Sequence, residues 1–225
     1  MTTAEIIYYV CTILAFVPAL VLHEVAHGFA AYKLGDNTAK SMGRLSLNPL
    51  KHLDPFGTVI LPAMLMFLNM PVFGFAKPVP YNPNNFENKR VGDCIVGLAG
   101  PLANLLMAIA GSLVMHLLSG FTPLAYSNDL FLYFYYYFLP QFIMINLYLM
   151  FFNLIPVPPL DGSSVIALFI PVQHLGKWYS IQAYALPILM IVLVACPYVL
   201  GFSPFSAYLN ATAGNLATLM IPGLA

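Results

Sequence analysis

Two histidines and a glutamate interrupt an apolar run near residue 25. His23 and His27 are four positions apart, so on a helix their imidazoles project from one face and can chelate a single cation. Glu24 would lie beside that cation, where it can take a proton from a bound water. The spacing predicts a metal centre at which Glu24 is the general base and water attacks a polarised carbonyl.

The same three residues allow a second interpretation. Ionisable groups are costly among apolar side chains unless water, a partner or a metal compensates them. They could line a polar cavity, or pack between helices, without binding a metal. Because an ionisable cluster within a membrane is a functional hypothesis by default, we favour the metal centre.

A catalytic centre of this type needs a third protein ligand and one open position. The candidate carboxylates are Asp36, Asp54, Asp93, Asp129 and Asp161. Asp161 follows the proline-rich run 156–159, which ends a helix and forces an extended backbone that can turn back into the protein. An exposed loop aspartate after a helix end is the alternative interpretation.

The composition indicates an integral membrane protein. Of the 225 residues, 60% are hydrophobic and 7% are charged, whereas soluble domains have about 25% charged residues. Eight basic and eight acidic residues give zero formal net charge, which leaves no basic surface for phosphates. We expect the lipid bilayer as a partner and no nucleic acid.

Four apolar stretches can cross about 30 Å of hydrocarbon as helices; they are residues 5–32, 92–118, 130–155 and 179–200. A fifth, 203–222, is weaker because polar residues and a glycine interrupt it. Residues 55–70 are too short for a crossing and are predicted to form a re-entrant or interfacial segment. All eight basic residues then lie on one side, which the positive-inside rule makes cytoplasmic.

The predicted fold is an all-α polytopic membrane protein with four to five transmembrane helices, a re-entrant segment and short membrane-associated β-strands. The strands are expected in segments 43–49 and 73–83, where apolar residues partly alternate and prolines recur. We expect one domain over residues 1–225, with a core at about 5–170 and C-terminal helices at about 179–222. This topology puts Asp161 on the same, cytoplasmic, side as His23 and His27.

Three motifs together resemble the site-2 protease family of membrane-embedded zinc metalloproteases; they are His23-Glu24-x-x-His27, Gly100-Pro101-x-x-Asn104, and Asn153 followed by Asp161-Gly162. The resemblance extends over about 20–165 and is to a compact bacterial or archaeal branch without PDZ or other accessory domains. It implies one Zn²⁺ per chain held by His23, His27 and Asp161. It also implies Glu24 as the catalytic base and Asn153 near the scissile bond.

We therefore expect an intramembrane zinc metalloprotease that hydrolyses transmembrane protein substrates by Glu24-assisted attack of a zinc-bound water. An unwound substrate would add to the edge of an extended segment. The alternatives are a divalent-metal transporter or sensor that uses the same ligands, and an inactive scaffold. Neither has a use for Glu24 as a base.

Other polar residues give weaker indications. Asn104 could bind the substrate or the developing oxyanion, or could join two helices. His52 is either a polar group near the site or a structural histidine, and His116 and His174 receive no role. The physiological substrate and the oligomeric state are not indicated.

Overall fold

The computed structural model describes residues 2–60, 63–64, 67, 77–126 and 128–224. Three helical runs within these residues are long and apolar enough to cross a membrane. They are α1 (Thr3–Lys33), the run Lys89–Pro123, which comprises α4 (Lys89–Leu118) and the start of η4 (Ser119–Tyr126), and the run Asp129–Asn153. The last run consists of α5 (Asp129–Leu132), η5 (Tyr133–Phe138) and α6 (Leu139–Asn153). The predicted all-α membrane protein is confirmed.

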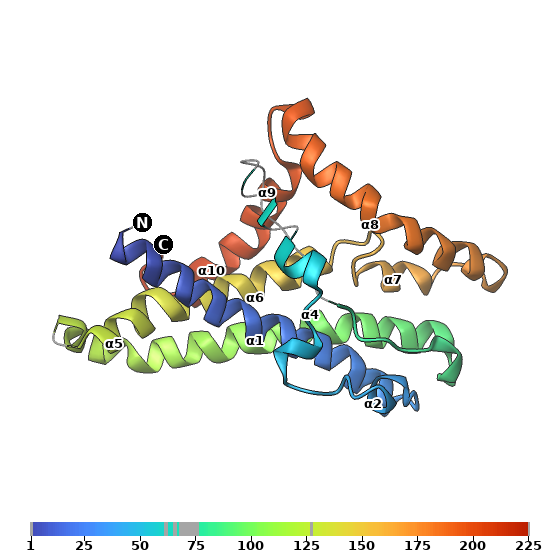
Figure 1. Ribbon diagram of the computed structural model, residues 1–225, viewed down its shortest axis with the longest axis horizontal. Coiled ribbons are helices and arrows are strands. Elements are labelled where there is room, and N and C mark those ends of the chain that lie inside the picture. Colours follow the sequence, from blue (N-terminus) through green and yellow to red (C-terminus); the bar gives the residue numbers. More distant parts are fainter. Residues whose placement is uncertain (1, 61–62, 65–66, 68–76, 127, 225) are drawn as a thin grey trace.

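Helices α1, α4 and α6 pack pairwise into an elongated bundle (Figure 1). Small residues allow the close approach, as is usual for helices in a membrane. Ala15 and Ala19 of α1 and Ala108 of α4 are fully buried. A Cβ atom at Gly111 would lie 3.0 Å from the Phe142 ring of α6. These small residues bring the helix backbones close together.

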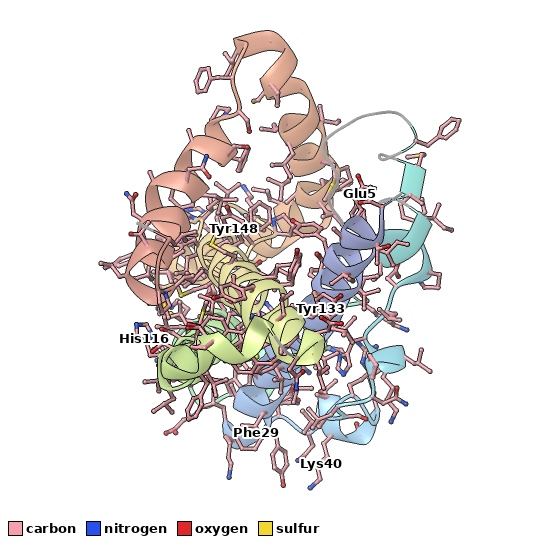
Figure 2. The ribbon with its side chains drawn as sticks, turned by 90° about the vertical axis from the view of Figure 1, so that its left-hand side faces the viewer. Glu5, Phe29, Lys40, His116, Tyr133 and Tyr148 are labelled. Atoms are coloured by element: carbon pink, nitrogen blue, oxygen red, sulfur yellow. The ribbon has the colours of Figure 1, made fainter. Side chains whose placement is uncertain are left out.

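Large apolar side chains cover the outside of the bundle. Ile13 and Leu14 of α1 and Leu106 and Leu113 of α4 are each more than half exposed. Phe29 points outward from the periphery in the view along the bundle (Figure 2). Exposed apolar belts of this kind suit contact with lipid.

The C-terminal residues form a continuous helix with a π-helical turn in its middle, and this helix packs against α6. Its parts are α9 (Pro204–Leu209), η6 (Asn210–Gly214) and α10 (Asn215–Met220). Ala213 and Ala217 are fully buried in the core cluster with Ile143 and Leu147 of α6. The π-helical turn coincides with the polar residues that weaken stretch 203–222 in the sequence.

Helix α8 (Val172–Leu200) extends away from the bundle (Figure 1). Its apolar part, Tyr184–Pro197, is shorter than the three spans. The predicted crossings at 179–200 and 203–222 thus remain predictions.

The described residues do not support the predicted β-strands. Segment 43–49 turns at Gly43, which has φ of +64°, and then enters η1 (Pro49–Lys51). Residues 77–82 are extended but belong to no ladder, since Pro78 and Pro80 have no N–H to donate. Residues 73–76 lie outside the described residues.

The expected re-entrant segment is described only in part. Its first residues form η2 (Pro55–Ile60), and most of 61–70 lies outside the described residues. Three short helices complete the loops beside the bundle; they are α2 (Thr38–Ser41), η3 (Pro83–Asn85) and α7 (Ser163–Ala167).

Candidate active site

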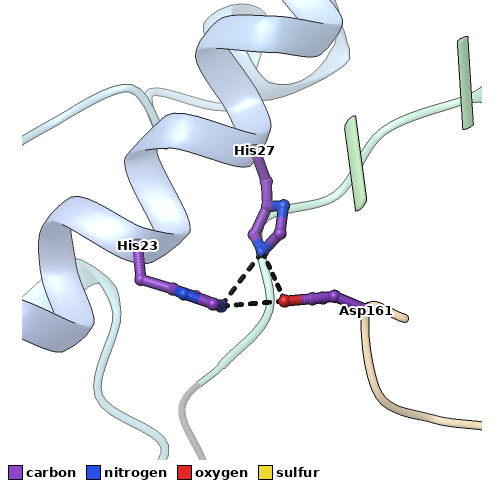
Figure 3. Close-up of side chains that lie close together, drawn as sticks. All are labelled: His23, His27 and Asp161. Carbon is purple, nitrogen blue, oxygen red and sulfur yellow. Dashed lines mark hydrogen bonds and ion pairs between the residues drawn. The ribbon is translucent and has the colours of Figure 1, made fainter. Parts of the chain in front are cut away.

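His23, His27 and Asp161 meet at one point between α1, α4 and the turn that joins α6 to α7. The two imidazole Nε2 atoms are 3.1 Å apart. Asp161 Oδ2 lies 3.2 Å from His23 Nε2 and 3.4 Å from His27 Nε2 (Figure 3). Within the described part of the chain, no other group of three His, Cys, Asp or Glu side chains could hold a metal.

These distances fit a zinc ion. Zinc bonds of about 2.0 Å at tetrahedral angles place neighbouring ligand atoms about 3.3 Å apart, close to all three observed separations. Asp161 Oδ2 is buried and accepts no hydrogen bond from any described residue. A buried acceptor without a donor is costly, and a cation at the centre of the three atoms would satisfy it.

Both histidines are held through their other ring nitrogen by α4. His27 Nδ1 lies 2.7 Å from the Val96 carbonyl oxygen, and His23 Nδ1 lies 2.6 Å from Asn104 Oδ1. A carbonyl oxygen only accepts, so His27 Nδ1 carries the proton and its Nε2 presents a lone pair. Hydrogen bonds of this kind fix the orientation of metal-binding histidines.

Two glycines let α4 approach this cluster. A Cβ atom at Gly100 would lie 2.6 Å from His23 Cε1 and would also meet His27 Nε2. At Gly97 a Cβ would lie 2.7 Å from Ser164 Cβ, beside the Asp161 turn. The Gly100-Pro-x-x-Asn104 motif therefore has two structural reasons: space for the imidazoles and a partner for His23.

The Asp161 turn is fixed by its own backbone. The Gly162 amide donates to the Asn153 carbonyl at 2.6 Å, and the Ser164 hydroxyl donates to the Asp161 carbonyl at 2.7 Å. A Cβ at Gly162 would lie 2.6 Å from the carbonyl carbon of Leu154, so only glycine fits after the aspartate. The Asn153 side chain donates to Leu149 of its own helix, and its contact with a substrate remains a prediction.

Glu24 is held by an extended segment, residues 77–82, which we call the strap. The Val79 amide donates to Glu24 Oε2 at 2.9 Å. The Val79 side chain lies over Gly28, where a Cβ would be 2.7 Å from Val79 Cγ1. The strap therefore lies on the face of α1 that carries the glutamate.

Both ends of the strap are fastened to neighbouring loops. Near the start, Arg44 Nη2 donates to the carbonyls of Lys77 and Pro78, at 2.7 and 3.2 Å. The Lys77 amide donates to the His52 carbonyl at 2.9 Å. At the other end the Asn82 amide donates to Asp36 Oδ2 at 2.8 Å.

Asp36 is fully buried and anchors the strap rather than a metal. It also accepts from the Thr38 hydroxyl at 2.6 Å and from Asn85 Nδ2 at 2.7 Å. Burial raises the pKa of the Asp36 carboxyl, but the hydrogen bonds from Thr38, Asn82 and Asn85 outweigh burial and hold this pKa below its ordinary value. Asp36 is thus an ionised structural carboxylate.

Two further candidate carboxylates have partners away from the cluster. Asp93 accepts from the Tyr81 hydroxyl at 2.6 Å, and Asp54 accepts from the Gly57 amide at 2.7 Å. His52 is fully buried, with Nε2 2.7 Å from the Ser46 carbonyl, and it supports the strap through its own carbonyl. Of the candidates, the structure brings only Asp161 to the histidines.

Comparison with known proteins finds curated relatives that carry the names "Putative zinc metalloprotease YwhC" and "Putative zinc metalloprotease Rip2". YwhC of Bacillus subtilis is 35% identical over 185 residues, which are 81% of this chain and 79% of that protein. Rip2 of Mycolicibacterium smegmatis is 27% identical over 222 residues, 92% of this chain and 80% of that protein. No protein-family model and no solved structure matches the chain.

Proposed function

The chain belongs to the family of zinc metalloproteases that includes YwhC and Rip2, and on this premise we propose that it is an intramembrane endopeptidase of the site-2 protease type. Its substrates are transmembrane proteins, and its zinc ligands are His23, His27 and Asp161. The distribution of basic residues supports an active site towards the cytoplasmic side of the membrane.

One observation carries this proposal. The ligand atoms of His23 and His27 and the carboxylate of Glu24 all project from α1, a helix apolar and long enough to span a membrane. Helix α4, which holds both histidines by hydrogen bonds, is also long and apolar enough to span a membrane. Hydrolysis at this cluster would take place among membrane helices.

A zinc ion held by His23, His27 and Asp161 would act as a Lewis acid that polarises the scissile carbonyl and makes water a nucleophile at neutral pH. Glu24 takes the proton from the attacking water and passes it to the leaving amine. The Val79 amide fixes Glu24 Oε2, so we assign the proton transfer to Oε1. A transporter or sensor has no need of a carboxylate held in this way beside the ligands.

The substrate must present an extended backbone, because a helix hides its carbonyls in its own hydrogen bonds. The strap cannot offer a free edge at its start, since the Lys77 and Val79 amides are already bonded and Pro78 and Pro80 have none. The amides of Leu45 and Leu47 donate to no described residue, and Leu47 is 66% exposed. We assign substrate pairing to residues 45–47.

The proposal is tested with the purified protein in liposomes that contain a single-span substrate. Wild type is expected to cleave the substrate, and Glu24→Gln is expected to retain zinc and lose at least about 100-fold in rate. Equal zinc content in the two proteins separates loss of the base from loss of the metal. Cleavage by Glu24→Gln at the wild-type rate would reject Glu24 as the base.

A further inference from the structure

A hydrogen-bonded chain of two buried asparagines connects the candidate zinc site to α6. His23 Nδ1 of α1 lies 2.6 Å from Asn104 Oδ1 of α4. Asn104 Nδ2 donates to Asn146 Oδ1 of α6 at 2.9 Å, and Asn146 Nδ2 donates to the Phe142 carbonyl at 2.8 Å. Both asparagines are fully buried. All three membrane-spanning runs meet in this chain.

The chain has a fixed direction because it ends on a backbone carbonyl. The Phe142 oxygen can only accept, so the amide nitrogen of Asn146 faces it and the Asn146 oxygen faces Asn104. The two N–H groups of Asn104 are taken by Asn146 Oδ1 and by the Ala19 carbonyl, the latter at 3.3 Å. The Asn104 oxygen therefore faces His23, whose Nδ1 must carry the proton.

This direction selects the imidazole tautomer that zinc needs. With the proton on Nδ1, His23 Nε2 presents a lone pair towards Asp161 Oδ2 and His27 Nε2. His27 obtains the same tautomer directly from the Val96 carbonyl. Among the described residues, His23 Nδ1 meets the Asn104 side chain rather than a backbone carbonyl, so its tautomer depends on side chains that mutation can remove.

The position of Asn146 is otherwise apolar. Ile143 and Leu147, its neighbours on α6, are fully buried in the hydrophobic core. An amide there is costly unless all of its hydrogen bonds are made. Packing alone gives no reason for an asparagine at this position.

We propose that Asn146 is a positioning residue of the zinc site, which acts through Asn104 to hold His23 in its metal-binding tautomer and orientation. The proposal concerns zinc affinity and stands whether or not the chain cleaves within the membrane. It predicts that Asn146 and Asn104 act as one unit rather than as two independent supports.

The test measures zinc affinity of the full chain in detergent by competition with a chromophoric chelator. Asn104→Ala is expected to weaken zinc binding about 10- to 100-fold, as for partners that orient metal-binding histidines. Asn146→Ala, one step further away, is expected to weaken it about threefold to tenfold. The double variant should bind zinc no more weakly than Asn104→Ala alone.

Ser112→Ala is the matched control, because Ser112 of α4 donates to the Met220 carbonyl at 2.7 Å and does not contact the site. It should lower the unfolding temperature of the zinc-free protein without changing zinc affinity. If Asn146→Ala does not fold, Asn146→Ser replaces it. A serine hydroxyl can still bond the Phe142 carbonyl within its own helix, but the serine side chain is one bond too short to reach Asn104. Wild-type zinc affinity in the folded Asn146 variant, or losses that multiply in the double variant, would overturn the proposal.

Discussion

The backbone amide of Val79 donates a 2.9 Å hydrogen bond to the carboxylate of Glu24, 55 residues earlier in the chain. The contact links the proposed catalytic base on α1 to the strap. The strap is fastened by Arg44 and His52 near its start and by Asp36 at its end. The orientation of Glu24 thus depends on residues in three separate loop segments.

Arg44 provides the first prediction. Arg44→Met removes both bonds from the guanidinium to the strap carbonyls, so the strap and Glu24 should shift. A displacement of about 1 Å can lower a catalytic rate about 100-fold, and we expect a fall in kcat of about 10- to 100-fold at unchanged zinc content. Lys51→Ala is the control, because the Lys51 ammonium donates to the Gly43 carbonyl of its own loop and to no strap residue among those described. Equal rates in the two variants would show that the strap does not orient Glu24.

Gly100 provides the second prediction. In Gly100→Ala the new methyl group would overlap both imidazole rings, so α4 and α1 must separate. We expect zinc binding to fall at least about 10-fold, measured as metal bound per chain after dialysis. Gly120→Ala, at a position where a Cβ would meet nothing within 4 Å, should retain zinc. Full zinc occupancy in Gly100→Ala would mean that this approach of α4 is not required.

Zinc removal should destabilise the protein. The three ligand atoms are all acceptors within 3.4 Å of one another, and a cation offsets their repulsion. Free zinc at about 100 times its Kd contributes about 2.7 kcal/mol to the free energy of unfolding. A chelator should therefore lower the unfolding temperature of wild type and leave that of His27→Ala unchanged. A similar decrease in both would place the stabilising metal elsewhere.

Asp36 gives a prediction about pH. The pKa of Asp36 in the folded protein lies below the unfolded value of about 3.9. Between these two pKa values the unfolded chain therefore binds more protons than the folded protein. The stabilisation is complete above about pH 3.9 and is lost as the pH falls through the folded pKa. Asp36→Asn should be less stable at neutral pH by about 1.5–3 kcal/mol.

Denaturant unfolding of the zinc-free proteins measures this effect without competition from metal release. The difference in unfolding free energy between wild type and Asp36→Asn should shrink as the solution becomes more acidic than about pH 4. A difference that stays constant to the lowest accessible pH would contradict an ionised Asp36.

The proposed substrate edge gives the last prediction. Leu47→Pro removes the backbone donor of an exposed residue, and one hydrogen bond contributes about 0.5–1.5 kcal/mol. We expect kcat/KM to fall about twofold to tenfold while zinc content stays unchanged. Leu47→Ala keeps the donor and is the control for loss of the side chain. Equal kcat/KM in both variants would exclude this edge.

The sequence predicted the elements that local pattern determines. The apolar stretches at 5–32, 92–118 and 130–155 correspond to the three helical runs that are long and apolar enough to cross a membrane. The H-E-x-x-H spacing places His23 and His27 on one helix face, and the proline run returns the chain so that Asp161 reaches them. These features follow from helix periodicity and from the backbone limits of proline.

The contacts that complete the site could not be predicted from pattern. Val79 reaches Glu24 through tertiary packing on Gly28, and Val79 lies outside the apolar stretches that the sequence identifies. Asn146 lies between apolar residues of α6 and belongs to none of the motifs that the sequence offers. The strands predicted at 43–49 and 73–83 were not found in the described residues, because alternation and prolines indicate extended backbone without specifying a partner strand.

The position of the cut in a single-span substrate tests the central claim most directly. Products made by wild type in liposomes, identified by mass spectrometry, should end at a peptide bond inside the apolar segment of the substrate. Glu24→Gln at equal zinc content should not produce them. Cleavage confined to the water-exposed flanks of the substrate would contradict an intramembrane protease.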